Sequence, residues 1–166
     1  FVVDNTNRTE ARYWIEDFLR VRQRQDNYHN THNTLAMCKK YVTKHLSKEF
    51  EVSKADQAEL LNETMKYFQE QESFSMDDFS EKVIRQPEVV ESFTRFRQEY
   101  EQDRDIRIED EFGISDSAVK KQARSYKSVI KLDRNFHIYV HGNRNLLEQG
   151  EDEKGKFYKV YYEEEE

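Results

Sequence analysis

The stretch SKADQAELLNETMKYFQE, residues 53–70, decides the class of fold. Ser53 lies three residues before Asp56, which is the spacing of a capping box, where each side chain accepts a hydrogen bond from the other residue's backbone N–H. Apolar residues then recur every three or four positions, at Ala58, Leu61, Met65 and Phe68. This spacing puts them on one face, so the stretch predicts a capped helix that buries that face in a core.

The segments before this helix are interpreted in the same way. Residues 7–26 predict a helix, because apolar residues recur there at helical spacing, at Ala11, Trp14, Ile15 and Phe18. Residues 27–33 are polar and have no apolar period, so we predict a connector there. A second helix follows, with an apolar face formed by Leu35, Cys38, Val42 and Leu46.

Further helices are predicted on the C-terminal side. Ser75 lies three residues before Asp78 and repeats the capping pattern ahead of a short helix. Pro87 suits the first turn of the next helix, where a missing N–H costs no hydrogen bond, and we predict that this helix ends before residue 103. Ser115 or Asp116 is placed to cap a last helix over residues 117–129.

Near the C-terminus the apolar period becomes that of a strand. Residues 136–141 and 157–162 alternate between two sets of side chains, which predicts two half-buried strands. With 4 Gly and 1 Pro, the chain offers few of the tight turns that an all-β fold needs. The sequence therefore predicts an α+β fold, mainly helical with about six helices and with a small C-terminal antiparallel β-hairpin or sheet.

We expect one compact fragment of a longer protein that lacks its N-terminal part, because the first residue is Phe1 and residues 1–3 resemble the tail of a strand. In this fragment, residues 1–114 form a helical region, and residues 115–166 form a helix with an antiparallel hairpin packed on it. An isolated hairpin is marginally stable, so it must pack on that helix or pair with strands from the missing part.

Composition restricts the class of protein. The single cysteine, Cys38, excludes an internal disulfide and fits a reducing compartment. No stretch approaches the roughly 20 apolar residues that span a bilayer, and the N-terminus lacks the pattern of a signal peptide. We therefore expect a cytoplasmic protein with no membrane partner.

The net charge of -7 hides a segregation of charge along the chain. Residues 51–114 carry 8 Lys and Arg against 18 Asp and Glu, and residues 145–166 carry 3 against 8. Residues 1–50 carry 9 against 6, and residues 115–144 carry 7 against 2. Two basic segments thus alternate with two acidic ones, which the average conceals.

The basic segments are the candidate binding sites, because Lys and Arg that neutralise phosphates release counterions and supply DNA affinity that is independent of sequence. The candidate DNA-binding residues form one patch near the end of the first helix and a second on the last helix, and they are Arg20, Arg22, Arg24, Lys120, Lys121, Arg124, Lys127 and Lys131. The alternative is that both patches are solubilising surfaces paired with acidic neighbours.

No catalytic or metal-binding motif stands out. His29, His32 and Cys38 are zinc-ligand types, but the histidines lie in the predicted connector and no second pair has zinc-finger spacing. His137 and His141 share a strand face, about 13 Å apart, without a marked orienting partner. Clustered Asp and Glu could hold magnesium in a nuclease, although an acidic chain has such clusters everywhere. We expect no catalytic residues, no metal and no cofactor.

Four stretches carry a resemblance to a known family. They are RYWIEDFL at residues 12–19, FQEQESF at 68–74, FTRF at 93–96 and SVIKLDRNFHIYVH at 128–141. In this order they resemble the C-terminal part of the YejK/NdpA-like bacterial nucleoid-associated proteins. The resemblance implies a cytoplasmic, nucleoid-localised, DNA-binding protein with no known catalytic residues. The acidic run at residues 163–166 departs from the family pattern and disfavours strong non-specific DNA binding.

Two functions are therefore predicted. The first is a non-enzymatic nucleoid-associated protein that binds double-stranded DNA without strong sequence specificity. The alternative is a protein–protein interaction or dimerisation domain that recruits partners to the nucleoid, through the acidic helices of residues 58–100 or an open strand edge.

Overall fold

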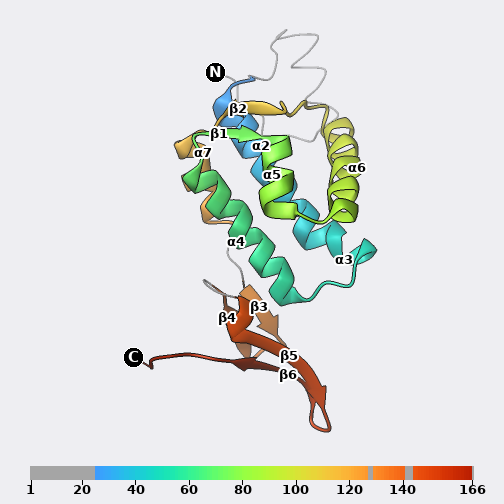
Figure 1. Ribbon diagram of the computed structural model, residues 1–166, viewed down its shortest axis with the longest axis vertical. Coiled ribbons are helices and arrows are strands. Elements are labelled where there is room, and N and C mark those ends of the chain that lie inside the picture. The colour runs from blue at the N-terminus through green and yellow to red at the C-terminus, as the bar shows by residue number, and fades with distance from the viewer. Residues whose placement is uncertain (1–24, 127–128, 141–143, 166) are drawn as a thin grey trace.

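The computed structural model describes residues 25–126, 129–140 and 144–165, and it confirms a mainly helical α+β fold (Figure 1). The helices are α2 (Asn27–Lys40), α3 (Leu46–Glu49), α4 (Lys54–Glu70), α5 (Met76–Phe79), α6 (Pro87–Arg104) and α7 (Asp116–Ala123). The strands are β1 (Ser73–Ser75), β2 (Glu111–Gly113), β3 (Val129–Leu132), β4 (Phe136–Tyr139), β5 (Leu147–Asp152) and β6 (Gly155–Val160). The helix predicted over residues 7–26 lies outside the described residues, apart from its last two positions.

Helix α4 is the central element, and it begins as predicted. The N–H of Asp56 donates to Ser53 Oγ at 3.1 Å, and the N–H of Ser53 donates to Asp56 Oδ2 at 2.9 Å. The predicted face is buried, at Ala58, Leu61, Met65 and Phe68. Helix α4 runs between the C-terminal hairpins at one end and β1 at the other (Figure 1). Helix α4 therefore lies next to the C-terminal hairpins at one end and next to β1 at the other, and links these two parts of the fold.

The predicted connector over residues 27–33 is wrong, because these residues form the first half of α2. Asp26 caps the helix by accepting the N–H of His29 at 2.9 Å. The hydroxyls of Thr31 and Thr34 donate to carbonyls four residues earlier, at 2.6 and 2.8 Å, so these polar side chains are buried with their hydrogen bonds made. The apolar face predicted for the helix after residue 33 is buried as expected, at Leu35 and Cys38 in α2 and at Val42 and Leu46 beyond its end.

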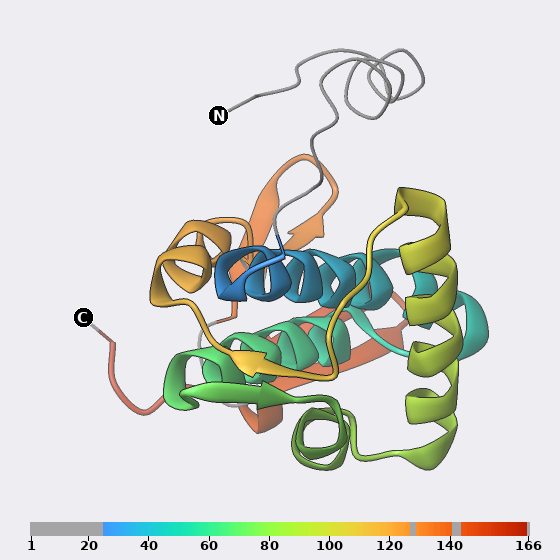
Figure 2. The same ribbon diagram turned by 90° about the horizontal axis from the view of Figure 1, so that it is seen from above.

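The short helix and the helix after it were predicted in the right places. Pro87 occupies the first turn of α6, which ends at Arg104, slightly later than predicted. Ser75 precedes α5, but its side chain makes no capping hydrogen bond, so that capping box is wrong. Viewed from above, α6 stands across the ends of the other helices (Figure 2). Aromatic side chains from α4, β1, α5 and α6 fill the space between them, at Phe68, Phe74, Phe79 and Phe93.

The described residues contain three antiparallel two-stranded sheets, of which the sequence indicated the two C-terminal ones in part. β1 pairs with β2, with Phe74 opposite Phe112. The last helix stops at Ala123 rather than reaching residue 129. Residues 129–132 form β3, because Val129 and Ile130 are β-branched residues, which favour strands, and the exposed Lys131 follows the buried Ile130. The two predicted strands belong to different hairpins, since β4 pairs with β3 and β6 pairs with β5.

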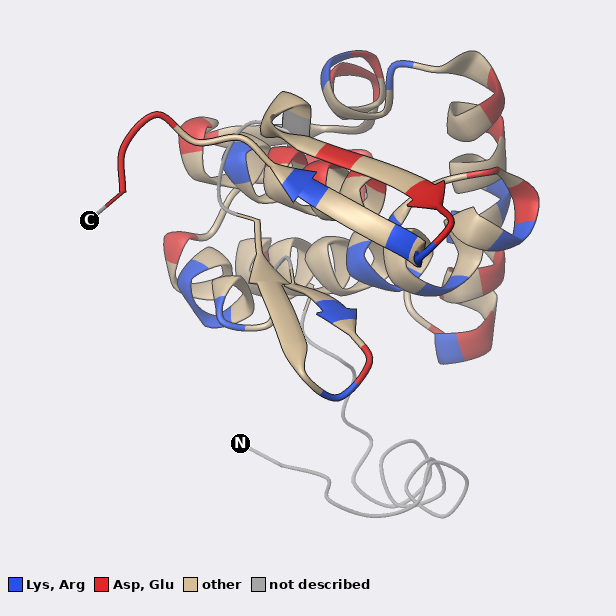
Figure 3. Cartoon of the chain, turned by 90° about the horizontal axis from the view of Figure 1, so that it is seen from below, with Lys and Arg blue, Asp and Glu red and all other residues tan. Residues whose placement is uncertain are grey.

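Charge divides the β5–β6 hairpin lengthwise. β5 carries carboxylates and β6 carries lysines, with Glu148 opposite Lys159 and Glu151 opposite Lys156 (Figure 3). Lys159 Nζ lies 3.5 Å from Glu148 Oε1. One strand of this hairpin is therefore negative and its partner positive.

A second, smaller core joins the C-terminal hairpins to α4. Ala55 and Ala58 on α4 pack with Ile130, Val140 and Leu147. Asn62 Nδ2, also on α4, donates to the carbonyl of Val140 at 3.1 Å. The strands thus contact α4, whereas α7 packs on α2 and α4. The division of the chain near residue 114 stays a prediction.

Candidate nucleic-acid interface

Helix α7 presents a basic surface because its apolar side chains all face the protein. Ala118 and Val119 are buried against neighbouring helices. Lys120, Lys121 and, one residue past the helix, Arg124 are exposed. The helix macrodipole is negative at this end, which stabilises cations there. The sequence therefore places three cations on the exposed side of one short helix whose apolar side is buried.

Two hydrogen bonds fix α7 on α2. At the start, the N–H of Ser115 donates to the buried Thr31 Oγ1 at 3.0 Å. After the end, the hydroxyl of Tyr126 donates to the carbonyl of Leu35. Burial raises the pKa of Tyr126 well above its usual value, so the phenol keeps the proton that it donates. The basic surface is therefore carried on a rigid support rather than on a loop.

Side chains of α2 extend the surface in a way that sequence reasoning missed. Lys121 Nζ lies 6.0 Å from the centroid of the Tyr28 ring, which stacks on His32 with an interplanar angle of 11°. Gln122 Nε2 donates to His32 Nδ1 at 2.8 Å. Residues 27–33 were assigned to a connector, so their rings were not placed beside α7. The signal that could have found them was Asp26, a good N-cap residue immediately before the run.

His32 is held neutral by its surroundings. Burial lowers its pKa first, and the positive charges of Lys121, His29 and Arg104 lower it further. Gln122 Nε2 lies 2.8 Å from His32 Nδ1 and 3.4 Å from His32 Nε2, so the amide can donate to the neutral ring.

Several cations of the acidic segment form ion pairs, whereas the cations described in the basic segment do not. In the acidic segment, Arg85, Arg95 and Arg97 all lie within 3.3 Å of a carboxylate oxygen. Within the described part of the chain, no ion pair involves the basic side chains of the 115–144 segment that are described, namely Lys120, Lys121, Arg124, Lys131 and Arg134. The alternative that these are solubilising cations paired with acidic neighbours therefore has no support in the described residues.

Lys131 extends the basic region onto β3, where its side chain is exposed. Arg134 lies in the turn that joins β3 to β4 and is exposed as well. Seen from below, the Lys and Arg of α7 and those of the β3–β4 hairpin lie toward the same margin of the molecule (Figure 3). Four of the predicted DNA-binding residues fall outside the described residues, namely Arg20, Arg22, Arg24 and Lys127, so their position stays a prediction.

Two of the candidate metal ligands, Cys38 and His29, are buried or bonded to other groups in the structure. Cys38 is buried, and burial raises the pKa of its thiol, which disfavours the thiolate that binds metals. His29 Nδ1 lies 2.7 Å from Asp26 Oδ1, so it is engaged in the helix cap. No group of three or more His, Cys, Asp or Glu suited to a metal ion occurs among the described residues. His141, the partner suggested for His137, lies outside them.

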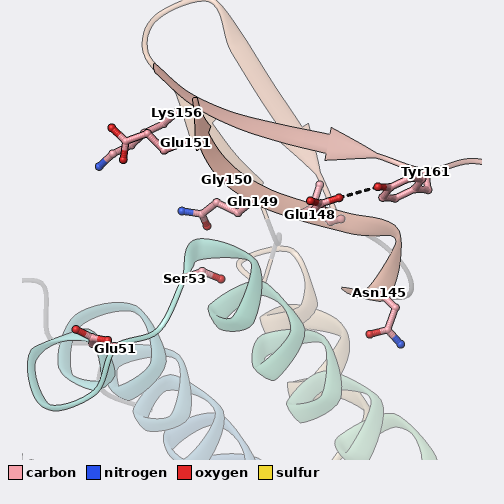
Figure 4. A pocket seen from close by; sticks show the side chains of 10 residues that line it. Glu51, Ser53, Asn145, Glu148, Gln149, Gly150, Glu151, Lys156 and Tyr161 are labelled. Atoms are coloured by element: carbon pink, nitrogen blue, oxygen red, sulfur yellow. Dashed lines mark hydrogen bonds between the residues drawn. The ribbon is translucent and has the colours of Figure 1, made fainter. Parts of the chain in front are cut away.

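A cleft opens between the β5–β6 hairpin and the start of α4, with a volume of about 1100 Å³ (Figure 4). Glu51, Glu148 and Glu151 line it, against a single lysine, Lys156. The hydroxyl of Tyr161 donates a hydrogen bond to Glu148 at 2.6 Å. This hydrogen bond is the largest of the effects that lower the pKa of the Glu148 carboxyl. Such a carboxylate-rich wall repels nucleic acid, so this cleft is not part of the basic surface.

Comparison with known families gives this geometry a context. The family model described as "Nucleoid-associated protein YejK" matches residues 1–165. The chain belongs to this family. The resemblance noted in the sequence is thereby confirmed, and a nucleoid-associated role follows for this YejK-family chain. No curated protein and no solved structure matches it. Among its described helices, none combines the length and the apolar character that crossing a membrane requires.

Proposed function

We propose that this chain binds double-stranded DNA without strong sequence specificity, through a basic surface made of Lys120, Lys121, Arg124 and Lys131. The observation that carries the proposal is the absence of carboxylate partners for these four cations among the described residues. A cation already paired with a carboxylate must break that pair to reach a phosphate. An unpaired one contributes its counterion release in full.

The two parts of the basic surface, on α7 and on β3, are close together along the chain. Helix α7 ends at Ala123 and β3 begins at Val129, so at most about 20 Å of extended chain separates them. Duplex DNA carries one charge per roughly 1.7 Å of its axis, so about a dozen phosphates fall within such a span. Phosphate contacts of this kind position a protein on DNA and carry no sequence information, which accounts for the lack of specificity.

The test is a fluorescence-anisotropy titration of the chain against a short duplex at roughly 50 and 200 mM salt. The variant K120E/K121E/R124E should weaken binding on every duplex and should lower the slope of log affinity against log salt by about one for each phosphate that is no longer neutralised. K48E/K66E/K154E, which reverses three exposed lysines outside the basic surface, is the charge-matched control and should change both much less. An equal effect of the two triple variants would remove α7 from the interface.

A second candidate function is recruitment of a protein partner or self-association. The observation in its favour is a group of exposed apolar side chains at the end of the β5–β6 hairpin, namely Leu146, Val160, Tyr161 and Tyr162. Contiguous exposed apolar surface marks protein contacts more often than DNA contacts. Sedimentation velocity of the wild type and of Y161S/Y162S distinguishes the cases, because self-association through this end requires the variant to dissociate.

We also propose that the role is non-enzymatic and located at the nucleoid. The support is the family's description, which names nucleoid association and no reaction. Incubation of plasmid and linear DNA with the chain and magnesium or manganese tests this directly. Cleavage that persists after repeated purification would contradict it.

A further inference from the structure

The β3–β4 hairpin has an apolar inner face that the protein covers only at its base. Ile130, near the base, is 1% exposed, and Leu132 is partly buried against the same small core. Phe136 pairs with Leu132 at the far end of the hairpin and is 67% exposed. The views from above and below both show the hairpin projecting past the helices (Figures 2 and 3). The apolar face therefore continues beyond the surface on which it packs.

A single exposed apolar residue is ordinary on a protein surface, so exposure of Phe136 alone carries nothing. What distinguishes this ring is its setting. Arg134 lies two residues before it in the turn, and Lys131 lies on the neighbouring strand; both are exposed. Neither cation forms an ion pair within the described ranges. An uncovered aromatic ring thus lies at the end of a narrow hairpin that also carries two exposed cations, Arg134 in the turn and Lys131 on the opposite face of the strands.

We propose that the tip of the β3–β4 hairpin enters the minor groove of duplex DNA, where Phe136 inserts between base pairs and bends the duplex. This proposal rests on the proposed function, because it assumes that the chain binds DNA. Apolar wedges of this kind partly unstack a base step and kink DNA by roughly 20–90°. Arg134, in the turn, and Lys131, on the face of β3 opposite to the ring, are the exposed cations of this hairpin that would neutralise phosphates near the kinked step.

The charges favour DNA over a protein partner for this tip. Residues 115–144 carry 7 Lys and Arg against 2 Asp and Glu, of which Asp133 is the one near the tip. Asp133 has a φ of 51°, in the left-handed region that Asp tolerates better than most residues, so its presence is explained by the turn. The exposed apolar group at the end of β5–β6 adjoins an acidic tail instead. The two exposed regions therefore suit partners of different charge.

The experiment measures bending and binding on the same samples. A duplex of about 30 base pairs carries a donor and an acceptor fluorophore at its two ends, and the full chain is titrated at low salt while energy transfer and anisotropy are recorded. F136A removes the ring, and F136L keeps an apolar wedge. Y162A, which removes an aromatic ring that is 69% exposed on the other hairpin, is the matched control. Circular dichroism of each variant verifies the fold.

We expect the wild type, F136L and Y162A to raise energy transfer on binding. F136A should bind within about tenfold of the wild-type affinity, because phosphate contacts dominate it, but should leave energy transfer at the value of free DNA. Wild-type binding without a rise in energy transfer would overturn the wedge and leave DNA binding intact, as would bending by F136A equal to the wild type. A wild type that does not bind at low salt would remove the proposed function itself. A change in oligomeric state on F136A with unchanged DNA bending would assign the tip to a protein contact and overturn the proposal.

Discussion

The hydroxyl of Tyr126 donates a hydrogen bond to the backbone carbonyl of Leu35, 91 residues earlier in the chain. Both residues are buried, and the bond ties the segment after α7 to the middle of α2. A contact between residues so far apart in the chain closes a long loop, which costs conformational entropy. We therefore expect its loss to lower the stability of the whole domain. Substitutions at Tyr126 therefore report how much this bond stabilises the packing of the segment after α7 on α2.

Replacing this tyrosine separates the hydrogen bond from the packing. Y126F should lower the free energy of unfolding by about 0.5–1.5 kcal/mol, because the buried Leu35 carbonyl loses one of its two donors and keeps the helical N–H within α2. Y126A should lower it by about 3–5 kcal/mol, since a cavity is added. Urea unfolding followed by circular dichroism measures both. An unchanged free energy of unfolding for Y126F would mean that the hydrogen bond contributes nothing of its own.

The capping box at the start of α4 should behave as a coupled pair. S53A should lower the free energy of unfolding by about 0.5–2 kcal/mol, because it leaves the Asp56 N–H without its side-chain acceptor. D56A should have a similar effect through the Ser53 N–H, and S53A/D56A should cost less than the sum of the two. S117A, at an exposed serine of α7, serves as the control. Strict additivity would show that the two caps act independently.

The depressed pKa of His32 predicts a specific dependence of stability on pH. Its pKa is lower in the folded chain than in the unfolded one, so the unfolded chain binds more protons between the two values. The contribution of His32 is therefore fully present above the unfolded value, about 6.5, and is lost as the pH falls from there toward the folded pKa. H32Q can still accept from Gln122 and should lose less stability than the wild type between about pH 7.5 and 5.5, as thermal unfolding would show. H137Q, at an exposed histidine of β4, should follow the wild type, and identical curves for all three proteins would contradict the assignment.

Gly150 and Phe157 predict a compensating pair in the β5–β6 hairpin. The two residues lie opposite each other, and a Cβ at residue 150 would meet the ring, with Cε2 only 2.9 Å away. G150A should therefore displace the ring from the strand and destabilise the hairpin by about 1–3 kcal/mol. G150A/F157A should cost less than the two single changes together. Hydrogen exchange of the β5 and β6 amides measures the local effect, and additive losses would show that the ring does not need the glycine.

The sequence predicted the helical core well because its signals are local. Ser53, Asp56 and the apolar residues after them define α4 without help from any other part of the chain. Pro87 did the same for α6. The polar first half of α2 could not be recognised from its pattern, because Thr31 and Thr34 satisfy their hydroxyls within the helix and are buried by neighbours distant in sequence. Tertiary burial there overrides the polar character of the side chains.

The strands and the site show the same division. The strands predicted over residues 136–141 and 157–162 were recognised by alternation, but β3 was not recognised, because the last helix was predicted to continue to residue 129 and the strand is only four residues long. Its true partner becomes evident only from the register with β4. For the candidate site, the exposed cations of α7 follow from helical periodicity. The position of the Tyr28 ring beside Lys121 could not be predicted in this way, and neither could the exposure of Phe136 at the hairpin tip. Both depend on how the elements are arranged in space, which no local sequence pattern encodes.

The lengthwise division of charge in the β5–β6 hairpin bears on what happens when many copies crowd together. An open strand edge is a template for aggregation, because its free N–H and C=O groups can pair with an identical edge. Two β5 edges side by side would set carboxylates against carboxylates, and two β6 edges would set lysines against lysines, both of which are unfavourable across strands. We therefore expect the hairpin to resist pairing with an identical edge into fibrils. The same charged side chains that attract each other across β5 and β6 within one hairpin would repel those of a second copy.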